Sequence, residues 1–226
     1  MATLRSELES ELLLREQLAA LRAREKTLQL AAKRALDIVG SLLLLTLLLV
    51  PGLLVALIIR LDSPGAPLLR QERVGRDGKR FRMWKFRTMC DRAHEMLEEL
   101  TDQNEHDGRI FKIRNDPRRT RVGSFLRKMS IDEFPQLLNV LAGDMSLVGP
   151  RPPFPSEVGR YSERHLGRLA MKPGMTGLWQ VSGRSNLPFE QMVELDLRYI
   201  RDWSLLADLS ILARTLPAVI SARGAF

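Results

Sequence analysis

Ile38–Ile59 reads IVGSLLLLTLLLVPGLLVALII and contains no charged residue. Its length matches the roughly 20 apolar residues that an α-helix needs to cross the hydrocarbon core of a bilayer. The alternative is a core helix of a soluble protein, but such a helix normally carries a polar face, which this stretch lacks. A signal peptide is excluded, because the stretch follows a charged segment and no small-residue cleavage site comes after it. We therefore predict a helix embedded in a membrane.

Basic residues flank this helix on both sides, which argues against a simple crossing. They are Arg22, Arg24, Lys26, Lys33 and Arg34 before it, and Arg60, Arg70, Arg73, Arg76, Lys79, Arg80 and Arg82 after it. The positive-inside rule would place both flanks in the cytoplasm. Pro51-Gly52 lies near the middle of the stretch, and a proline kinks a helix because it lacks the backbone N–H. We therefore predict a re-entrant helix that bends at Pro51 and returns to the same side.

The composition is that of a folded protein with an anionic partner. Of the 226 residues, 45% are hydrophobic and 27% charged, which excludes fibrous, collagen-like and disordered classes. The net charge of +8 indicates nucleic acid, lipid headgroups or a phosphorylated substrate, and charge alone does not choose among them. The single cysteine, Cys90, excludes an internal disulfide framework and a CxxC zinc site. The three histidines are scattered, which argues against a histidine-based metal site.

Outside the membrane segment, the pattern is mainly helical with one short hairpin. Residues 1–30 are charged, Leu-rich and free of Gly and Pro, which predicts a helix. Its interrupted leucine heptad leaves a coiled coil and a solvated or membrane-surface helix both open. Asp77-Gly78 is a favoured hairpin turn between two short runs in 68–89. Further helical patterns occur at about 119–128, 132–142, 155–170, 188–200 and 204–222.

We therefore predict an α+β fold, mainly α with a small β-hairpin, in a monotopic membrane protein with interfacial helices. The expected domains are a charged amphipathic helix at 1–30, the re-entrant helix at 31–61 and a cytosolic domain at 62–226. The apolar stretch 204–222 near the end of the chain fits either core packing or a position in the membrane interface.

Ser130-Ile131-Asp132-Glu133 places two adjacent carboxylates in a predicted first helical turn. Ser-x-x-Glu is the capping-box pattern, and acids in a first turn complement the helix dipole without any further role. A helix N-terminus equally favours an ionised carboxylate and attracts phosphate. In such a place an ionised aspartate can attack phosphorus while its neighbour binds a divalent cation. The local pattern alone leaves both roles open.

Two arginines near these carboxylates favour a phosphate site. Arg127 lies about one turn upstream of Asp132, and Arg151 lies in the Gly- and Pro-rich loop Gly143–Pro153. The planar guanidinium suits bidentate contacts to phosphate, and prolines hold such a loop at low entropic cost. For the other arginines of this region, a solvated surface position is an equal alternative.

Several ordered segments together resemble a known family. They are Trp84–Met89 (WKFRTM), Phe125–Pro152 (FLRKMSIDEFPQLLNVLAGDMSLVGPRP), Lys172–Arg184 (KPGMTGLWQVSGR) and Glu194–Tyr199 (ELDLRY), followed by Asp208. They look like the signature of the bacterial sugar transferase family. Its members are the monotopic phosphoglycosyl transferases that begin the assembly of exopolysaccharides, O-antigens and glycoprotein glycans. The resemblance covers roughly residues 31 to 222.

The resemblance implies the central chemistry of the site. Asp132 would be the nucleophile that forms a covalent phosphosugar intermediate. Glu133 would bind Mg²⁺, the expected cofactor, together with Asp132. Arg127 and Arg184 would contact phosphates or the nucleotide, as would Arg151.

Further matching residues have less defined roles. Pro150 and Pro152 flank Arg151 in the family's Pro-Arg-Pro loop. Lys85 and Arg87 match a basic motif beside the site, with a structural or electrostatic role. Asp196 and Asp208 match two further acids of the family. For these acids, helix capping or pairing with arginine is the alternative to a supporting role in the site.

The resemblance also implies the reaction, the partners and the location. The enzyme would transfer a sugar-1-phosphate from a UDP-sugar to undecaprenyl phosphate, release UMP and follow ping-pong kinetics. Its partners would be these substrates and inner-membrane lipids, with no nucleic acid. The catalytic domain at 62–226 would face the bacterial cytoplasm, and the N-terminal helix is compatible with a homodimer. The sequence does not reveal the sugar, whose recognition we expect in 101–116 and around 155–190.

Two alternative functions remain open. A conventional glycosyltransferase would release UDP, but it normally needs a Rossmann-type domain, for which 226 residues leave little room beside a membrane segment. A non-catalytic membrane scaffold would explain the apolar segment and leave the carboxylates idle. A basic nucleic-acid-binding protein is disfavoured by the long uncharged segment.

Overall fold

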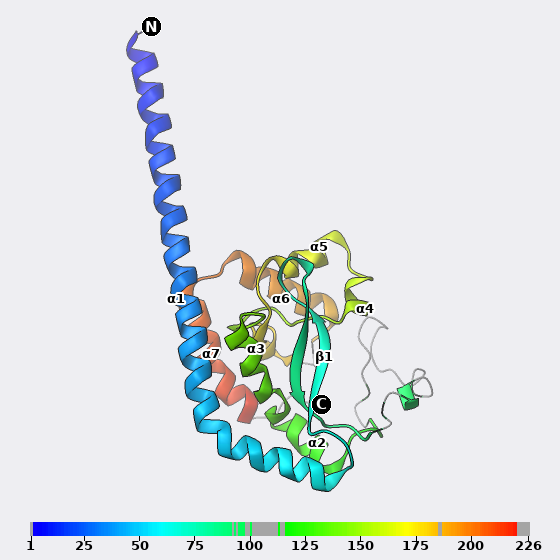
Figure 1. Cartoon of the computed structure of the whole chain (residues 1–226). Helices are drawn as coiled ribbons and strands as arrows, with labels where there is room; N and C mark the ends of the chain where they lie inside the picture. The colour runs from blue at the N-terminus through cyan, green and yellow to red at the C-terminus, as the bar shows by residue number, and fades with distance from the viewer. Residues whose placement is uncertain are drawn as a thin grey trace. The chain divides into compact units, whose positions relative to one another are not determined.

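The structure is a computed structural model of the chain (Figure 1). It describes residues 2–91, 93, 95–97, 100, 113, 116–184 and 187–220, with side chains from residue 26 onward apart from 97 and 220. The chain divides into two compact units, Met1–Leu36 and Asp37–Phe226. The first unit belongs to helix α1, and the second contains all the other elements. Most of the predicted loop at 101–116 lies outside the described residues.

The second unit combines helices with four short strands. The helices are α1 (Ala2–Asp62), which begins in the first unit, and α2 (Arg121–Lys128), α3 (Leu137–Ala142), α4 (Pro155–Val158), α5 (Glu163–Leu166), α6 (Phe189–Arg201) and α7 (Leu205–Ile220). The 3₁₀ turns are η1 (Arg76–Gly78), η2 (Glu95–Leu97), η4 (Ile131–Gln136), η5 (Gly167–Ala170) and η6 (Gln180–Ser182). The strands are β1 (Leu68–Val74), β2 (Arg80–Phe86), β3 (Ser146–Val148) and β4 (Gly174–Thr176). The predicted mainly helical fold with a small hairpin is confirmed.

The hairpin forms where the sequence predicts it. β1 and β2 pair antiparallel, with Leu68 opposite Phe86 and Val74 opposite Arg80. Asp77 and Gly78 have φ values of 58° and 76°, the left-handed region that tight two-residue hairpin turns require. Asp tolerates this region better than most residues, and Gly enters it without steric cost.

A second, parallel sheet was not predicted. β3 pairs with β4. The two backbones approach so closely here that a Cβ on Gly174 would lie 2.0 Å from the backbone nitrogen of Gly149, so only glycine fits at position 174. Both strands lie in Gly- and Pro-rich stretches that the sequence pattern assigns to loops. Strands of three residues are too short to produce a periodic pattern.

Two predicted helices are interrupted in the structure. The predicted helix 132–142 begins as the 3₁₀ turn η4 and continues as α3. The capping-box prediction for Ser130 is wrong, because this residue is left-handed (φ 56°) and its side chain makes no capping hydrogen bond. The predicted helix 155–170 separates into α4, α5 and η5, with Gly159 ending the first and Ser162 beginning the second.

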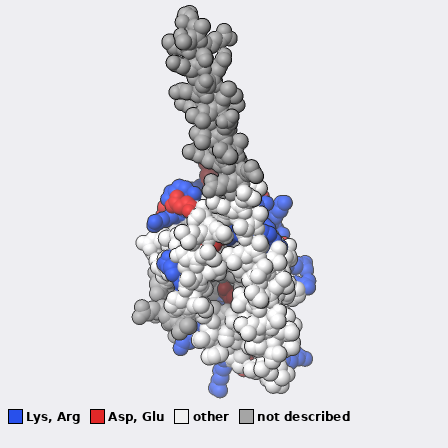
Figure 2. All heavy atoms as spheres, turned by 90° about the vertical axis from the view of Figure 1, so that its left-hand side faces the viewer, with Lys and Arg blue, Asp and Glu red and all other residues white. Residues whose placement is uncertain are grey.

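Helix α1 presents an apolar surface from the second unit. Within it, Lys26–Asp62 is long and apolar enough to cross a membrane, and only 6% of its most apolar window is buried. A core helix would be mostly buried, so that alternative is excluded. Figure 2 shows an almost uncharged face on this side of the molecule, with Lys and Arg at its edges. Figure 1 shows α1 changing direction in its cyan part, and Pro51 is the proline inside the helix.

The main core joins elements that are far apart in the sequence. Met83 of β2, Leu137 of α3, Val148 of β3 and Ile211 of α7 belong to one buried cluster. Asp37 ties α1 to this core, since its carboxylate accepts hydrogen bonds from the Ser146 hydroxyl and the Leu147 N–H at 2.9 and 2.8 Å. These contacts hold α1, β2, α3, β3 and α7 in fixed positions around the site.

Candidate active site

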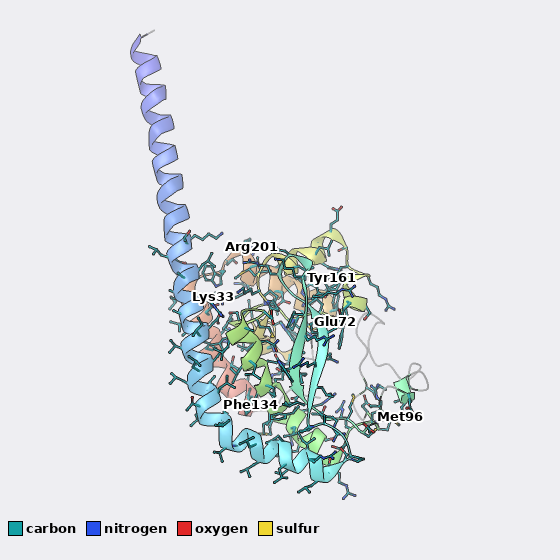
Figure 3. The ribbon with its side chains drawn as sticks, viewed as in Figure 1. Lys33, Glu72, Met96, Phe134, Tyr161 and Arg201 are labelled. Atoms are coloured by element: carbon teal, nitrogen blue, oxygen red, sulfur yellow. The ribbon has the colours of Figure 1, made fainter. Side chains whose placement is uncertain are left out.

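Asp132 and Glu133 converge on one lysine. The Lys85 ammonium lies 3.1 Å from Oδ2 of Asp132 and 3.4 Å from Oε1 of Glu133. Asp132 is 5% exposed, whereas the Glu133 side chain is 35% exposed. Phe134, labelled in Figure 3, marks the position of this turn at the lower part of the unit. A buried carboxylate that is paired with a cation at the wall of a cavity is placed for nucleophilic attack.

Asn139 holds the carboxylate turn against the strand that carries Lys85. Its Oδ1 accepts the Trp84 N–H at 2.9 Å, and its Nδ2 donates to the Arg82 carbonyl at 2.8 Å. The side chain of α3 therefore pairs with the free edge of β2 as a further strand would. Since η4 runs directly into α3, Lys85 and Asp132 meet although 47 positions separate them.

The carboxylates line a large cavity with a surplus of basic side chains. Its volume is about 1170 Å³, above the roughly 300–1,000 Å³ that is usual for one small ligand. The basic lining residues are Arg73, Lys85, Arg87, Arg118, Arg119, Arg127, Arg160 and Arg184. The acidic ones are Asp91, Asp116, Asp132, Glu133 and Glu157. The excess of cations among the described residues suits an anionic ligand.

The cavity also has an apolar wall. Leu44 of α1 and Leu212, Ala218 and Val219 of α7 line it. Helix α7 therefore borders the site in addition to contributing Ile211 to the core.

Arg127 and Arg184 both line the cavity and interact electrostatically with Asp132 and Glu133, respectively. Arg127 donates from Nε to the Thr88 hydroxyl at 2.8 Å. Burial lowers the pKa of Arg127, and the negative charge of Asp132 opposes this shift. Burial likewise lowers the pKa of Arg184, with Glu133 opposing. Nη1 of Arg184 is buried without a partner among the described residues, and a bound anion would supply one.

Backbone strain is concentrated at the cavity. Among the described non-glycine residues, Asp77, Ser130 and Arg184 have positive φ. Asp77 occupies the hairpin turn, whereas Ser130 and Arg184 line the cavity. Left-handed conformations cost of order 1–2 kcal/mol per residue, and they persist where the surrounding structure holds a functional arrangement.

The Pro-Arg-Pro loop contributes differently from the prediction. Arg151 does not line the cavity, because its guanidinium forms a bidentate pair with Glu157 at 2.8 and 3.2 Å. Pro150 is fully buried, and the Pro152 carbonyl accepts a hydrogen bond from Arg73 at 3.0 Å. The arginine that lines the cavity at this loop is therefore Arg73 of β1.

Asp196 and Asp208 lie outside the cavity and are both 0% exposed. Asp196 accepts two hydrogen bonds from Arg168, at 2.9 and 2.6 Å. Asp208 accepts from the Tyr199 hydroxyl at 2.7 Å and from the Trp203 indole at 3.3 Å. Burial and the adjacent Asp208 carboxylate raise the pKa of Tyr199, which keeps it a hydrogen-bond donor. The structure does not bring these two acids to Asp132.

Arg87 lines the cavity but binds the end of α1. Its guanidinium donates to the carbonyls of Ser63, Pro64 and Gly65. It thereby fixes the connection between the apolar helix and the hairpin. Its position suggests an anchoring role at the edge of the site.

The two carboxylates fit a magnesium ion that takes further ligands from a substrate. Among the described residues, no three His, Cys, Asp or Glu side chains cluster as a metal site. Mg²⁺, however, is commonly held by one or two carboxylates together with phosphates and water. Asp132 and Glu133 already direct an oxygen each towards one cation, the Lys85 ammonium. This donor pair suits an ion that arrives with a diphosphate.

Sequence comparison identifies the family. Residues 28–222 match the family model described as bacterial sugar transferase. The chain belongs to this family. The resemblance inferred from the sequence is thereby confirmed.

Similar members come from several bacteria. The chain is 45% identical over 197 residues to the galactosyl transferase CpsE of Streptococcus agalactiae, covering 87% of this chain and 44% of that protein. It is 47% identical over 199 residues to the UDP-galactose-lipid carrier transferase of Erwinia amylovora, covering 86% and 41%. It is 44% identical over 202 residues to the UDP-glucose:undecaprenyl-phosphate glucose-1-phosphate transferase of Caulobacter vibrioides, covering 86% and 72%. The chain thus spans less than half the length of the first two.

The family resemblance placed Lys85 in a basic motif beside the site but did not predict its contact with Asp132, and sequence reasoning did not assign Arg73 to the site. Lys85 lies in the matched segment Trp84–Met89, but its contact with Asp132 depends on the packing of β2 against η4. Arg73 appears in the sequence as one of many basic residues after the membrane segment. Only the structure shows it buried over the Phe154 ring, 3.3 Å from the centroid.

Proposed function

We propose that the chain transfers a sugar-1-phosphate from a UDP-sugar to undecaprenyl phosphate and releases UMP. The observation that carries the proposal is the buried Asp132 on the wall of a basic cavity, paired with Lys85 and adjacent to Glu133. The printed names of two relatives support the substrates, since they mention UDP-galactose with a lipid carrier and UDP-glucose with undecaprenyl phosphate. Such a transfer begins the assembly of an exopolysaccharide, an O-antigen or a related glycan.

The first step is a displacement at the phosphorus that carries the sugar. A carboxylate oxygen of Asp132 attacks this phosphorus, and the bond to the bridging oxygen of the diphosphate breaks. UMP leaves with the bonding electrons, and the sugar phosphate remains on Asp132 as an acyl phosphate. A nucleophilic aspartate divides one difficult transfer into two easier ones.

The second step regenerates the carboxylate. A phosphate oxygen of undecaprenyl phosphate attacks the same phosphorus, and its bond to Asp132 breaks. The product is a lipid diphosphate sugar, and Asp132 is again ionised. Two displacements at one residue predict ping-pong kinetics.

The other residues of the site interact with the negative charges of Asp132 and of the substrate phosphates. Lys85 pairs with Asp132 at 3.1 Å and orients its carboxylate. Arg127 and Arg184 face the region of negative charge and can bind phosphate oxygens. Glu133 and Asp132 would hold Mg²⁺, which neutralises phosphate charge when it is bound.

The membrane placement follows from the apolar face of α1. Leu43, Leu47 and Leu53 are 67%, 73% and 63% exposed, and exposing so many large apolar side chains to water is unfavourable. We propose that this part of α1 enters the inner membrane, bends near Pro51 and returns to the cytoplasmic side. The catalytic unit then lies at the depth of the lipid phosphate, and its basic rim meets the anionic leaflet.

The decisive experiment is product analysis with the full chain in lipid nanodiscs. UDP-glucose or UDP-galactose is supplied with undecaprenyl phosphate and Mg²⁺, and UMP and UDP are quantified separately. We expect UMP release in the wild type and a loss of at least about 10⁴-fold in Asp132→Asn, because removing a nucleophile eliminates the covalent path. Glu72→Gln, an exposed acid labelled in Figure 3, is the control and should retain activity.

Two results would contradict the proposal. Release of UDP would indicate a conventional glycosyltransferase. Full activity of Asp132→Asn would remove the covalent intermediate from the mechanism. A membrane scaffold would release neither nucleotide.

A further inference from the structure

A second cavity lies behind the carboxylate turn and has no role in the steps above. Its volume is about 360 Å³. Val55 and Ile58 of α1 form one side, and Val122 and Phe125 of α2 form the other. Phe125 is 58% exposed and Ile58 48%, so these two side chains lie at the mouth. We call this cavity the α1–α2 groove.

The groove and the active-site cavity share one turn of the chain. Ile131 lines the groove, whereas its neighbours Ser130 and Asp132 line the active-site cavity. Side chains of this turn therefore alternate between an apolar compartment and a basic one. Whatever packs against Ile131 is in contact with the residue next to the nucleophile.

Hydrocarbon is the chemistry that suits the groove. Apart from Arg121, the described lining is entirely aliphatic or aromatic. Leu54 and Leu57 of the same part of α1 do not line the groove, but both are 55% exposed and belong to the segment proposed to lie in the bilayer. A groove at that surface is exposed to lipid chains rather than to water, and filling it with hydrocarbon follows the hydrophobic effect.

Arg121 indicates that the lipid bound in the groove has an anionic head group. It is exposed at the first position of α2 and lines the groove. It has no ion-pair partner in the part of the chain that the structure describes. An arginine at the rim of an apolar groove complements a lipid with a phosphate head.

We propose that the α1–α2 groove binds the isoprenoid chain of the lipid phosphate acceptor, close to its phosphate end. This inference rests on the proposed function. The acceptor is the ligand that combines the two chemistries, and the shared turn puts its chain beside Asp132. The groove would hold the chain of the acceptor, whose phosphate would reach the phosphosugar on Asp132 in the basic cavity after UMP has left.

The test fills the groove and compares acceptors of different chain length. Ile58→Trp replaces an aliphatic side chain at the mouth with a bulky indole ring. Leu57→Trp is the matched control because Leu57 precedes Ile58 on α1, is similarly exposed and does not line the groove. Both variants are assayed in nanodiscs with undecaprenyl phosphate and with geranyl phosphate, whose chain has two isoprene units. A second pair, Arg121→Gln and Lys128→Gln, compares two exposed cations of α2, of which only Arg121 lines the groove.

We expect Ile58→Trp to raise the KM for undecaprenyl phosphate about tenfold. That factor corresponds to about 1.4 kcal/mol, or the burial of about two methylene groups. The KM for geranyl phosphate and the single-turnover release of UMP from UDP-sugar alone should stay at the wild-type level. Leu57→Trp and Lys128→Gln should resemble the wild type, whereas Arg121→Gln should raise the KM for both acceptors.

The outcomes separate this inference from the proposed function. If Ile58→Trp leaves the KM for undecaprenyl phosphate at the wild-type value, the groove does not bind the acceptor chain, while UMP release still supports the reaction. If Ile58→Trp and Leu57→Trp raise it equally, the effect belongs to the membrane surface and not to the groove. If the wild type releases no UMP, the proposed function itself fails.

Discussion

Asp132 and Asp196 are both buried aspartates paired with a cation, yet their surroundings differ. The Lys85 side chain that pairs with Asp132 is 22% exposed and is shared with Glu133. The Arg168 side chain that pairs with Asp196 is 2% exposed and also donates to the Tyr161 hydroxyl at 2.7 Å. Asp132 lines the large cavity, and Asp196 does not.

This difference supports the reactive role proposed for Asp132 and a structural role for Asp196. A carboxylate that faces a cavity can give up its contact with a lysine and instead attack a substrate phosphorus or bind a metal ion. A carboxylate enclosed with an arginine has no space for a ligand, and its pair mainly fixes the packing of α6 against η5. Both acids match the family pattern, so matching alone does not distinguish the two roles. Substitutions should do so.

The largest expected effect on stability is that of Asp196→Asn. The change leaves Arg168 buried without its charged partner, and breaking a buried pair in this way costs about 3–5 kcal/mol. Thermal unfolding in detergent should show a clear drop in Tm. Asp202→Asn removes an exposed acid of the same region and should leave Tm unchanged. An unchanged Tm in Asp196→Asn would mean that the pair is not structural.

Arg151→Met should have a smaller effect that depends on pH. The substitution removes the partner of the buried Glu157 and should cost about 3 kcal/mol at neutral pH. Burial alone would raise the pKa of Glu157, but the Arg151 guanidinium prevails and holds it below its ordinary value.

The sign of that pH dependence follows from linkage. Because the folded pKa of Glu157 is depressed, the stabilisation is present above the unfolded pKa and is lost as pH falls through the folded pKa. We therefore expect denaturant unfolding of the wild type and of Arg151→Met, measured from pH 7 down to pH 3, to show a difference in unfolding free energy that becomes smaller in acid. A difference that grows in acid would contradict the pairing.

Asp208→Asn should have the smallest effect of the three. The asparagine keeps one acceptor oxygen but presents an NH₂ group to one of the two donors, Tyr199 or Trp203. Leaving one buried donor unsatisfied costs about 1–3 kcal/mol. UMP release measured well below the Tm should stay near the wild-type rate. Loss of activity in the folded variant would instead give Asp208 a role in the reaction, as the family resemblance implied.

The local parts of the fold were predictable because local chemistry decides them. The hairpin turn needs two residues that tolerate positive φ, and Asp77-Gly78 supplies them. Helices α2, α6 and α7 follow from apolar periodicity, within a few residues of the predicted bounds. The second sheet was missed because its strands are stabilised by partners nearly 30 positions apart, such as Ser146 and Gly174, and not by their own pattern.

The sequence by itself determined the apolar segment, the family and the adjacent acids Asp132 and Glu133. Each of these features can be recognised within short stretches of consecutive residues. The tertiary structure decided which cations meet them. Lys85 reaches Asp132 across 47 positions, Arg73 replaces Arg151 at the cavity, and Asp196 is enclosed with Arg168. The physical reason is that burial and ion pairing depend on the distance between atoms. That distance is set by how β2, η4 and α6 pack, and no local pattern in the chain encodes it.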